Sequence, residues 1–401
     1  MANTILTPTA VTREAQRILH QKLNFVGSIN RQYDSSFAQS GARIGDSLKV
    51  RLPNQYTVRT GASLSTQDTT ETSTTLQVAT QKGVDLTFSS AELTLSLDDF
   101  SARILEPAMA VLAANIEADA LNMYKDVYQI SDEDGVAVSL KSFLYGRQKL
   151  NDSLAPQDNN RSAIISTDHS VKLVDALKGL FHDSAAIKEQ YKEGIMGRTA
   201  GFDFYENTLL VPHTTGTAVK TTTYTVNGAV TANGSSSVVV ASAGSTTFKQ
   251  GDIITVAGCF RVHPETKVST GVLQQFVVTA DYAGGAGTVS FAPAIYTSGG
   301  RQNVVAAGLA NGSAIVKVGA AASETLTPSM VYHRDAFTFA TADLILPKGV
   351  DFAAREVMDG ISMRTVRQYT ISNDSYPCRI DVLYGYKTIR PELACRIHAD
   401  G

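Results

Sequence analysis

The stretch ILEPAMAVLAANIEADALNMYKDVY, residues 104–128, carries the strongest helical pattern in the chain. Apolar side chains recur along it every three or four residues, which is the spacing of one face of an α-helix. A capping signal at Ser96 and Asp99 precedes it, and Pro107 lies where a first turn or a kink tolerates proline. We therefore predict a spine helix of about 22–30 residues, roughly 33–45 Å long, within a domain spanning residues 89–155.

Residues 46–88, which precede this helix, are predicted to form an extended hairpin with flanking strands. Apolar and polar residues alternate in Leu48–Leu52 and Thr75–Ala79, and the alternation continues in Val84–Phe88. Residues 54–75 are rich in Thr, Ser and Gln and offer no core of their own. Such a hairpin is marginal alone and needs a partner surface, so we expect it to lie on another subunit, with a mobile surface loop as the alternative.

Charged residues of this hairpin are the candidate contacts between subunits. Arginine on the hairpin is expected to meet a neighbour's carboxylate, and acidic residues are expected to meet a neighbour's Arg or Lys. Exposed ion pairs contribute only about 0–1 kcal/mol each, but many copies of a reversible contact stabilise a closed assembly. The four candidates are Arg51, Arg59, Asp68 and Glu71.

The N-terminal segment, residues 1–45, contains an amphipathic helix at residues 9–24. Val11, Ala15, Ile18, Leu19 and Leu23 form one apolar stripe on it. We expect this stripe to pack on a neighbouring subunit, with docking on its own domain as the alternative.

Mixed α/β patterning describes residues 156–213 and again residues 326–401. A helix near Leu140–Asn151 leads into this part, and a buried strand and a helix that starts at Asp168 follow. Further strands are predicted at Phe202–Tyr205, Val331–Thr341, Ser362–Thr370 and Cys378–Tyr384.

Between these two parts, residues 214–325 have few charges and are dominated by Thr, Val, Ala, Gly and Ser. Short alternating runs separated by Gly-Asp, Asn-Gly and Gly-Gly predict an inserted small β-barrel or sandwich. The runs are Thr222–Val226, Ser237–Ala241, Ile253–Ala257, Gln275–Thr279, Thr288–Phe291 and Ala314–Val318.

Composition and charge narrow the function classes. The 401 residues are 43% hydrophobic, and Lys+Arg 35 against Asp+Glu 38 gives a formal charge of -3. This balance argues against a protein that grips nucleic acid, which needs a clustered basic surface. No signal peptide or membrane span of about 20 apolar residues is expected.

Motifs of the common enzyme classes are missing from the sequence. No GxSxG elbow, P-loop, dinucleotide fingerprint or HExxH occurs, and the three cysteines form no CxxC pair. We expect no catalytic, cofactor or metal site. The adjacent acid–histidine pairs are expected to be helix caps or surface pairs, at Asp168-His169, His182-Asp183 and His333-Arg334-Asp335.

In order of parts, the chain resembles the HK97-type major capsid fold of tailed phages, an α+β fold with an N-terminal arm, an E-loop hairpin, a spine helix and peripheral and axial domains. It is most similar to the podoviral coat proteins that carry an inserted domain. Four stretches carry the likeness: Ala113–Glu117, Gly201–Tyr205, Phe248–Gly258 and the Tyr384-Gly385 to Arg390-Pro391-Glu392 ending.

This resemblance implies a major capsid protein that assembles with itself into hexamers and pentamers of an icosahedral head around double-stranded DNA, which it does not bind by sequence. It also implies a scaffolding protein, a portal protein and, in some heads, a decoration protein as partners, with assembly in the host cytoplasm. Members of the closer subgroup do not generally cross-link, so Lys82 is expected to be a solvated surface charge.

Two other functions stay open at this point. A cellular nanocompartment (encapsulin-like) shell protein shares the fold type but typically lacks the inserted β-domain. An α/β enzyme or adhesion protein with an appended β-sandwich needs a site or a secretion signal that the sequence does not show.

Overall fold

The computed structural model describes residues 8–34, 47–64, 66–67, 71–89, 104–133, 136–177, 197–221, 224–241, 244–319, 321–327, 329–358, 360–372 and 375–399. Its contacts divide the chain into two compact units. Unit 1 comprises Met1–Arg51, Ser73–Leu121 and Phe337–Ile389, and unit 2 comprises Leu52–Thr72, Asn122–Ala336 and Arg390–Gly401. The predicted α+β class is confirmed.

Unit 1 is built on a six-stranded sheet in the order β1-β18-β21-β20-β19, with β4 also paired to β21. The long pair is β4 with β21, which are antiparallel over ten residue pairs. The strands are β1 (Asn30–Asp34), β4 (Thr80–Ser89), β18 (Phe337–Ala342), β19 (Phe352–Met358), β20 (Ile361–Arg367) and β21 (Ser375–Thr388). β18 is buried along its whole length and lies inside the sheet, between β1 and β21.

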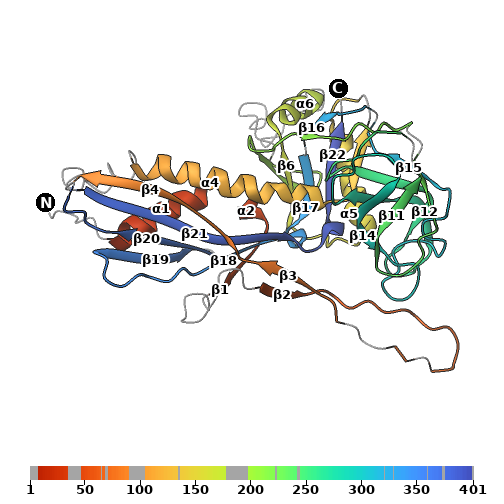
Figure 1. The fold of residues 1–401 in the computed structure, drawn as a ribbon, viewed down its shortest axis with the longest axis horizontal. Helices are drawn as coiled ribbons and strands as arrows, with labels where there is room; N and C mark the ends of the chain where they lie inside the picture. The colour runs from red at the N-terminus through yellow and green to blue at the C-terminus, as the bar shows by residue number, and fades with distance from the viewer. Residues whose placement is uncertain are drawn as a thin grey trace, which may run out of the picture. The chain divides into compact units, whose positions relative to one another are not determined.

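The spine helix of unit 1 is α4 (Glu106–Leu121), which runs along β4 in Figure 1. It has 16 residues, fewer than predicted, and the chain continues as a 3-10 helix η4 (Asn122–Asp126). Pro107 lies in its first turn, as predicted. The capping signal at Ser96 and Asp99 lies outside the described residues. Val111, predicted on the apolar face, is exposed, so the buried face is the one through Leu112 and Ile116.

The N-terminal helix α1 (Pro8–Lys22) packs on α4 and β19 of its own unit. The preferred prediction of a neighbouring subunit is wrong in this structure, and the alternative of docking on its own domain holds. The stripe of Ala15, Ile18 and Leu19 is buried against these elements. A four-residue helix, α2 (Phe25–Ser28), follows and leads into β1.

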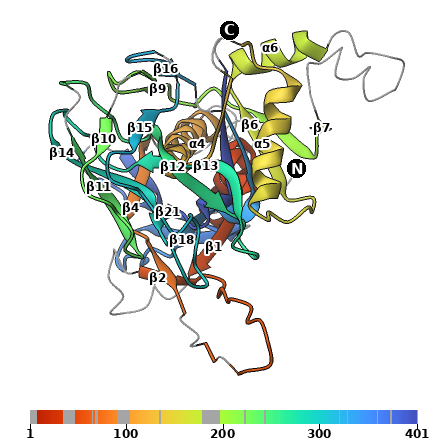
Figure 2. The same cartoon turned by 90° about the vertical axis from the view of Figure 1, so that its right-hand side faces the viewer.

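Unit 2 contains a second six-stranded sheet in the order β5-β22-β17-β6-β8-β7. Helices α5 (Leu140–Asp152) and α6 (Thr167–Leu177) lie beside it (Figure 2), and a capping box of Ser139 and Ser142 starts α5. The strands are β5 (Ile130–Glu133), β6 (Arg161–Ile165), β7 (Arg198–Thr199), β8 (Phe202–Glu206), β17 (Ser329–His333) and β22 (Ala394–Ala399).

Six further strands of unit 2 form a closed barrel in the order β10-β11-β14-β13-β12-β15. Each of the six predicted runs contains a strand of this barrel among its described residues, and closure decides between the two architectures that the pattern left open. They are β10 (Tyr224–Val226), β11 (Ser235–Ala241), β12 (Ile253–Val262), β13 (Ser269–Val278), β14 (Gly287–Ile295) and β15 (Ala314–Lys317). Alternation is the reason, because every second side chain of each strand points inward.

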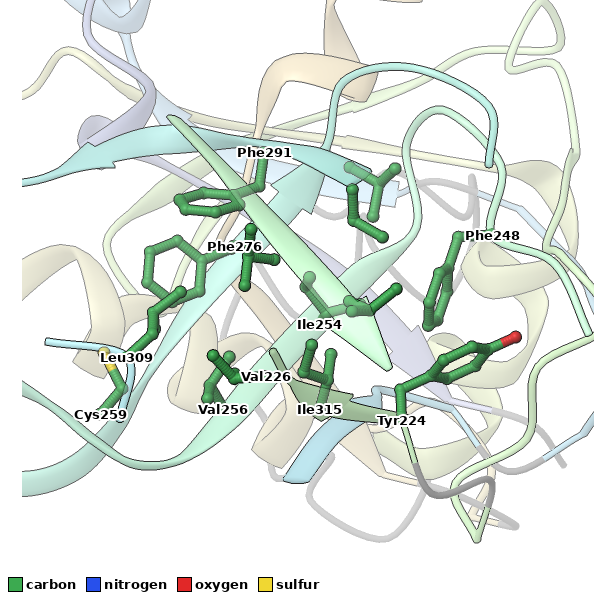
Figure 3. Packing of buried hydrophobic residues seen from close by; sticks show 14 of the residues in the cluster. Tyr224, Val226, Phe248, Ile254, Val256, Cys259, Phe276, Phe291, Leu309 and Ile315 are labelled. Atoms are coloured by element: carbon green, nitrogen blue, oxygen red, sulfur yellow. The ribbon is translucent and has the colours of Figure 1, made fainter. Parts of the chain in front are cut away.

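The barrel interior is filled by large apolar side chains (Figure 3). Phe276 and Phe291 meet edge to face with ring centroids 4.8 Å apart, and Tyr224 and Phe248 lie 5.0 Å apart. Burying one such side chain contributes about 1.5–3 kcal/mol to folding. The barrel therefore has a core of its own.

The chain enters and leaves the barrel through a narrow neck. β9 (His213–Thr214) and β16 (Thr325–Leu326) pair antiparallel, with Thr214 opposite Thr325. The interpretation of residues 214–325 as an inserted domain stays a proposal, and this neck at both of its ends supports it. The other predicted domain limits likewise stay proposals.

Candidate assembly surfaces

The base of the arm is a short antiparallel ladder between β2 (Ser47–Arg51) and β3 (Ser73–Gln77), with five residue pairs. Beyond this ladder, the described part of residues 52–72 contains no strand, and Figure 1 draws it as a loop. The predicted two-stranded arm is therefore too long. Pro53 supplies no N–H, and Thr, Ser and Gln side chains compete for the backbone hydrogen bonds of a ladder.

Gln67 holds the two legs of the loop together where no ladder exists. Its Oε1 accepts hydrogen bonds from the backbone N–H and the hydroxyl of Thr57 at 2.8 and 2.9 Å. Its Nε2 donates to the Thr57 carbonyl at 2.5 Å. One side chain thus pairs with a backbone unit as a strand residue would, and this contact was not predicted.

Arg59, one of the four predicted contacts, binds its own loop. Its Nη1 donates to the carbonyl oxygens of Gly61 and Ser63, the second at 3.1 Å. Gly61 has φ +99°, a left-handed conformation that glycine adopts without strain, so the loop turns here. The guanidinium therefore stabilises the turn, and its contact with a neighbour's carboxylate stays a prediction.

The other three predicted contacts are spread along the arm. Arg51 ends β2 and Glu71 precedes β3, and both are exposed. Asp68 lies outside the described residues. Their contacts with another subunit stay predictions.

Exposed apolar side chains on the same loop were missed by the sequence analysis. Val58 is 94% exposed, Leu64 is 83% exposed and Tyr56 is 54% exposed. The sequence signal for them was three apolar residues within a polar stretch. That signal does not tell a buried side chain from an exposed one, and only the structure shows that these three are exposed. These exposed side chains make the loop a candidate interaction surface.

The root of the loop lies against the barrel, within unit 2. A Cβ atom added at Gly300 would collide with the backbone of Gln55 and Tyr56, so the two backbones touch. Only glycine permits this approach. The contact fixes the position of residues 55 and 56, from which the rest of the loop extends.

The barrel is joined to the sheet of unit 2 by Gln275 of β13. Its Oε1 accepts the N–H of Ile130 at 3.0 Å, and its Nε2 donates to the Ile130 carbonyl at 3.1 Å. Lys149 Nζ donates to the same Oε1 at 3.2 Å. Ile130, Ile253 and Val277 form a small apolar cluster at this junction, so the barrel is held by both polar and apolar contacts.

A buried carboxylate, Asp252, holds the turn before β12 to the neck. Its Oδ1 lies 2.9 Å from His213 Nε2, and its Oδ2 accepts the N–H groups of Gly216 and Lys249 at 2.9 Å each. Gly251 supplies the positive φ of the turn, +99°. This is the physical reason for Gly-Asp in the Phe248–Gly258 stretch.

The C-terminal stretch also has a structural explanation. A Cβ atom at Gly385 would collide with the Gln77 carbonyl, where β21 passes close to the end of β3, so both belong to the packing of unit 1. In unit 2, Arg390 Nε lies 2.8 Å from Glu392 Oε1, and the Glu392 carbonyl accepts a 2.7 Å bond from Gln129. The Gly and the Arg-Pro-Glu residues therefore serve folding.

Lys82 is not the solvated charge that was predicted. Its Nζ lies 2.7 Å from Asp119 Oδ2 on α4, and that oxygen also accepts the Tyr384 hydroxyl at 2.6 Å. Burial and the Asp119 carboxylate raise the pKa of Tyr384, so its hydroxyl stays protonated and donates. The three side chains join β4, α4 and β21.

In the acid–histidine pairs that the structure describes, the histidines are buried, whereas Asp168 and Asp335 are exposed. The expectation of caps or surface pairs is therefore wrong for the two histidines. His169 Nδ1 lies 2.7 Å from the Ser329 hydroxyl, and His333 Nε2 lies 3.1 Å from Asp158 Oδ1. Each joins neighbouring elements of unit 2 and is 5% exposed or less. His182-Asp183 lies outside the described residues.

Within the described residues, no group of His, Cys, Asp or Glu is arranged to hold a metal ion. Among those same residues, no helix is long and apolar enough to cross a membrane. The three cysteines are free and buried.

Comparison with solved structures finds phage capsid chains at low identity. A chain of Mycobacterium phage Che8 is 11% identical with a TM-score of 0.45, covering 93% of this chain and 90% of that one. The cyanophage P-SCSP1u capsid is 10% identical with a TM-score of 0.44, covering 93% and 87%. The mature capsid of bacteriophage PhiM1 is 12% identical with a TM-score of 0.43, covering 93% and 86%.

No curated protein sequence matches the chain. A family model does match, over residues 22–396, and its description is "P22 coat protein - gene protein 5". The match covers both units, the arm and the barrel. The chain therefore belongs to the P22 coat protein family.

Proposed function

We propose that this phage major capsid protein builds its icosahedral shell from hexamers and pentamers, in which the loop of residues 52–72 lies across a neighbouring subunit. The exposed Val58 and Leu64 carry this proposal. Covering an exposed apolar side chain with another surface lowers the free energy of the assembly. In every capsomer, the neighbouring copy of the chain can supply that surface.

Shell assembly requires contacts that are weak singly and strong together. A contact between one patch and a different patch on the next copy closes into rings when the rotation permits, which generates five- and six-membered capsomers. Gln67 and Arg59 order the loop before it binds, so less conformational entropy is lost on contact. Arg51, Asp68 and Glu71 are proposed as additional ionic contacts at the arm.

The proposed partners follow from the family. A scaffolding protein would direct curvature during assembly in the host cytoplasm, a portal protein would occupy one vertex, and a decoration protein is a further candidate. The shell would enclose double-stranded DNA without reading its sequence. The formal charge of -3 supports this role, because a strongly basic wall would bind the packaged DNA.

The test is negative-stain electron microscopy with sedimentation of the expressed chain, alone and with its co-expressed scaffolding protein. Closed shells, tubes or capsomer rings are expected. A chain that stays monomeric with the scaffolding protein present would refute assembly as proposed. A nanocompartment shell, the earlier alternative, is not favoured, since the family match is to a phage coat protein.

A further inference from the structure

Glu117 is a buried carboxylate on the spine helix that accepts hydrogen bonds from three consecutive backbone N–H groups. It is 1% exposed. Its Oε1 accepts hydrogen bonds from the backbone N–H groups of Asn24 and Phe25, the first at 3.1 Å. Its Oε2 accepts one from the N–H of Val26 at 3.2 Å. These N–H groups belong to the first turn of α2, where a helix leaves its donors without intrahelical partners.

Within unit 1, this contact joins the N-terminal segment to the spine helix α4. Phe25 and Val26 are fully buried beside it, and the Phe25 ring meets Phe337 edge to face at 5.5 Å. Upstream, Gln16 donates to the Ile361 carbonyl, so α1 has a polar anchor as well. A buried carboxylate without its N–H partners would be costly, so the segment and the helix hold each other in register.

Directly downstream, β1 closes the edge of the main sheet. β1 pairs with β18 in parallel over five residues, from Asn30 opposite Thr338 to Asp34 opposite Ala342, and the other neighbours in this sheet are antiparallel. A parallel pair is slightly less stable per residue. Without β1, the buried strand β18 would become the edge, and an uncovered apolar edge pairs with other chains.

We propose that Glu117 is a positioning residue for assembly: by locking α2 on the spine helix it keeps β1 on its own subunit, so that no second copy can pair with β18. This proposal rests on the proposed function. The Ala113–Glu117 stretch, which pointed to the spine helix, thus contains a residue with a second role that helix formation does not require.

The experiment compares Glu117→Ala and Glu117→Gln with Asp119→Asn in the unassembled full chain. Asp119 lies on the same helix and binds Lys82 and Tyr384, and it makes no hydrogen bond to the described residues 24–34, so it is the matched control. Hydrogen exchange is measured for residues 24–34 and for the barrel strands. Sedimentation velocity measures association at concentrations where the parent chain is monomeric.

We expect Glu117→Ala to accelerate exchange at residues 24–34 about tenfold or more, since three hydrogen bonds to a charged acceptor are lost. Glu117→Gln keeps one acceptor oxygen and should restore part of the protection. Both variants should associate into irregular species, whereas Asp119→Asn should leave residues 24–34 and the monomer unchanged.

Three results would overturn the proposal: unchanged exchange at residues 24–34, equal acceleration throughout the chain, or local acceleration without association. If Glu117→Ala yields no folded protein, the same readouts on Glu117→Gln decide. Because these measurements use the unassembled subunit, failure of the parent chain to form shells is a separate result that bears on the proposed function alone.

Discussion

Replacing Val58 and Leu64 by serine should greatly raise the concentration that shell assembly requires while leaving the subunit folded. Both side chains are almost fully exposed in the subunit, at 94% and 83%, so the free energy of unfolding should change by no more than about 0.5 kcal/mol. In a shell that covers the loop, each side chain would contribute about 1.5–3 kcal/mol of burial, which the serine variants largely lose.

The size of the change in the threshold concentration for assembly distinguishes apolar from ionic contacts. A loss of about 3–6 kcal/mol per arm raises the threshold concentration for assembly about 100-fold or more, because about 1.4 kcal/mol corresponds to a factor of ten. An exposed ion pair contributes about 0–1 kcal/mol, so losing a contact of Arg59 to a neighbour changes the threshold by less than about tenfold. The sequence-based hypothesis that Arg59→Glu impairs assembly without unfolding the subunit is tested in the same series.

Light scattering over a concentration series measures the threshold, and thermal unfolding checks the fold. Val239→Ser is the matched control, because Val239 is also an exposed valine but lies on the barrel strand β11. An unchanged threshold in the double serine variant would refute the apolar contact of the arm. A larger effect from Arg59→Glu than from the double variant would restore the ionic interpretation.

Three further predictions concern folding. Gln275→Ala removes the bonds to Ile130 and should cost about 1–3 kcal/mol and accelerate hydrogen exchange at residues 130–133, as measured by mass spectrometry, whereas Gln302→Ala should not. Gly385→Ala should lower the free energy of unfolding by about 1–3 kcal/mol or more, because its Cβ would meet backbone, and soluble yield and the melting temperature should fall with it. Burial raises the pKa of the Cys259 thiol to about 12 and those of the other two cysteines to about 11, so thiol reagents at pH 8.5 should react only after unfolding. Because the folded pKa values lie above the unfolded ones, the stabilisation is complete below about pH 8.5 and is lost as pH rises toward 11–12, which urea titrations across pH can measure.

Local periodicity was sufficient to predict most elements of this chain. The six barrel strands followed from alternation alone, and α4, α5 and β6 followed from their apolar spacing, since burial on one side imposes a repeat on the sequence. The Gly-Asp turn before β12 was equally visible, because few residues adopt a positive φ. Stretches such as these also carried the family likeness.

The spacing of apolar and polar residues did not predict contacts between residues that are far apart in the sequence. The three N–H groups that donate hydrogen bonds to Glu117 lie 91 to 93 positions away in the sequence. The Gln275 amide pairs with Ile130, which lies 145 positions away. Nothing local distinguishes these two side chains from other polar residues. Likewise, the arm's polar composition suggested a ribbon, but only the fold shows that its ladder ends at Arg51 and that Val58 stands exposed. Repeating spacing encodes which face of an element is buried, whereas the partner that buries it depends on how the whole chain folds.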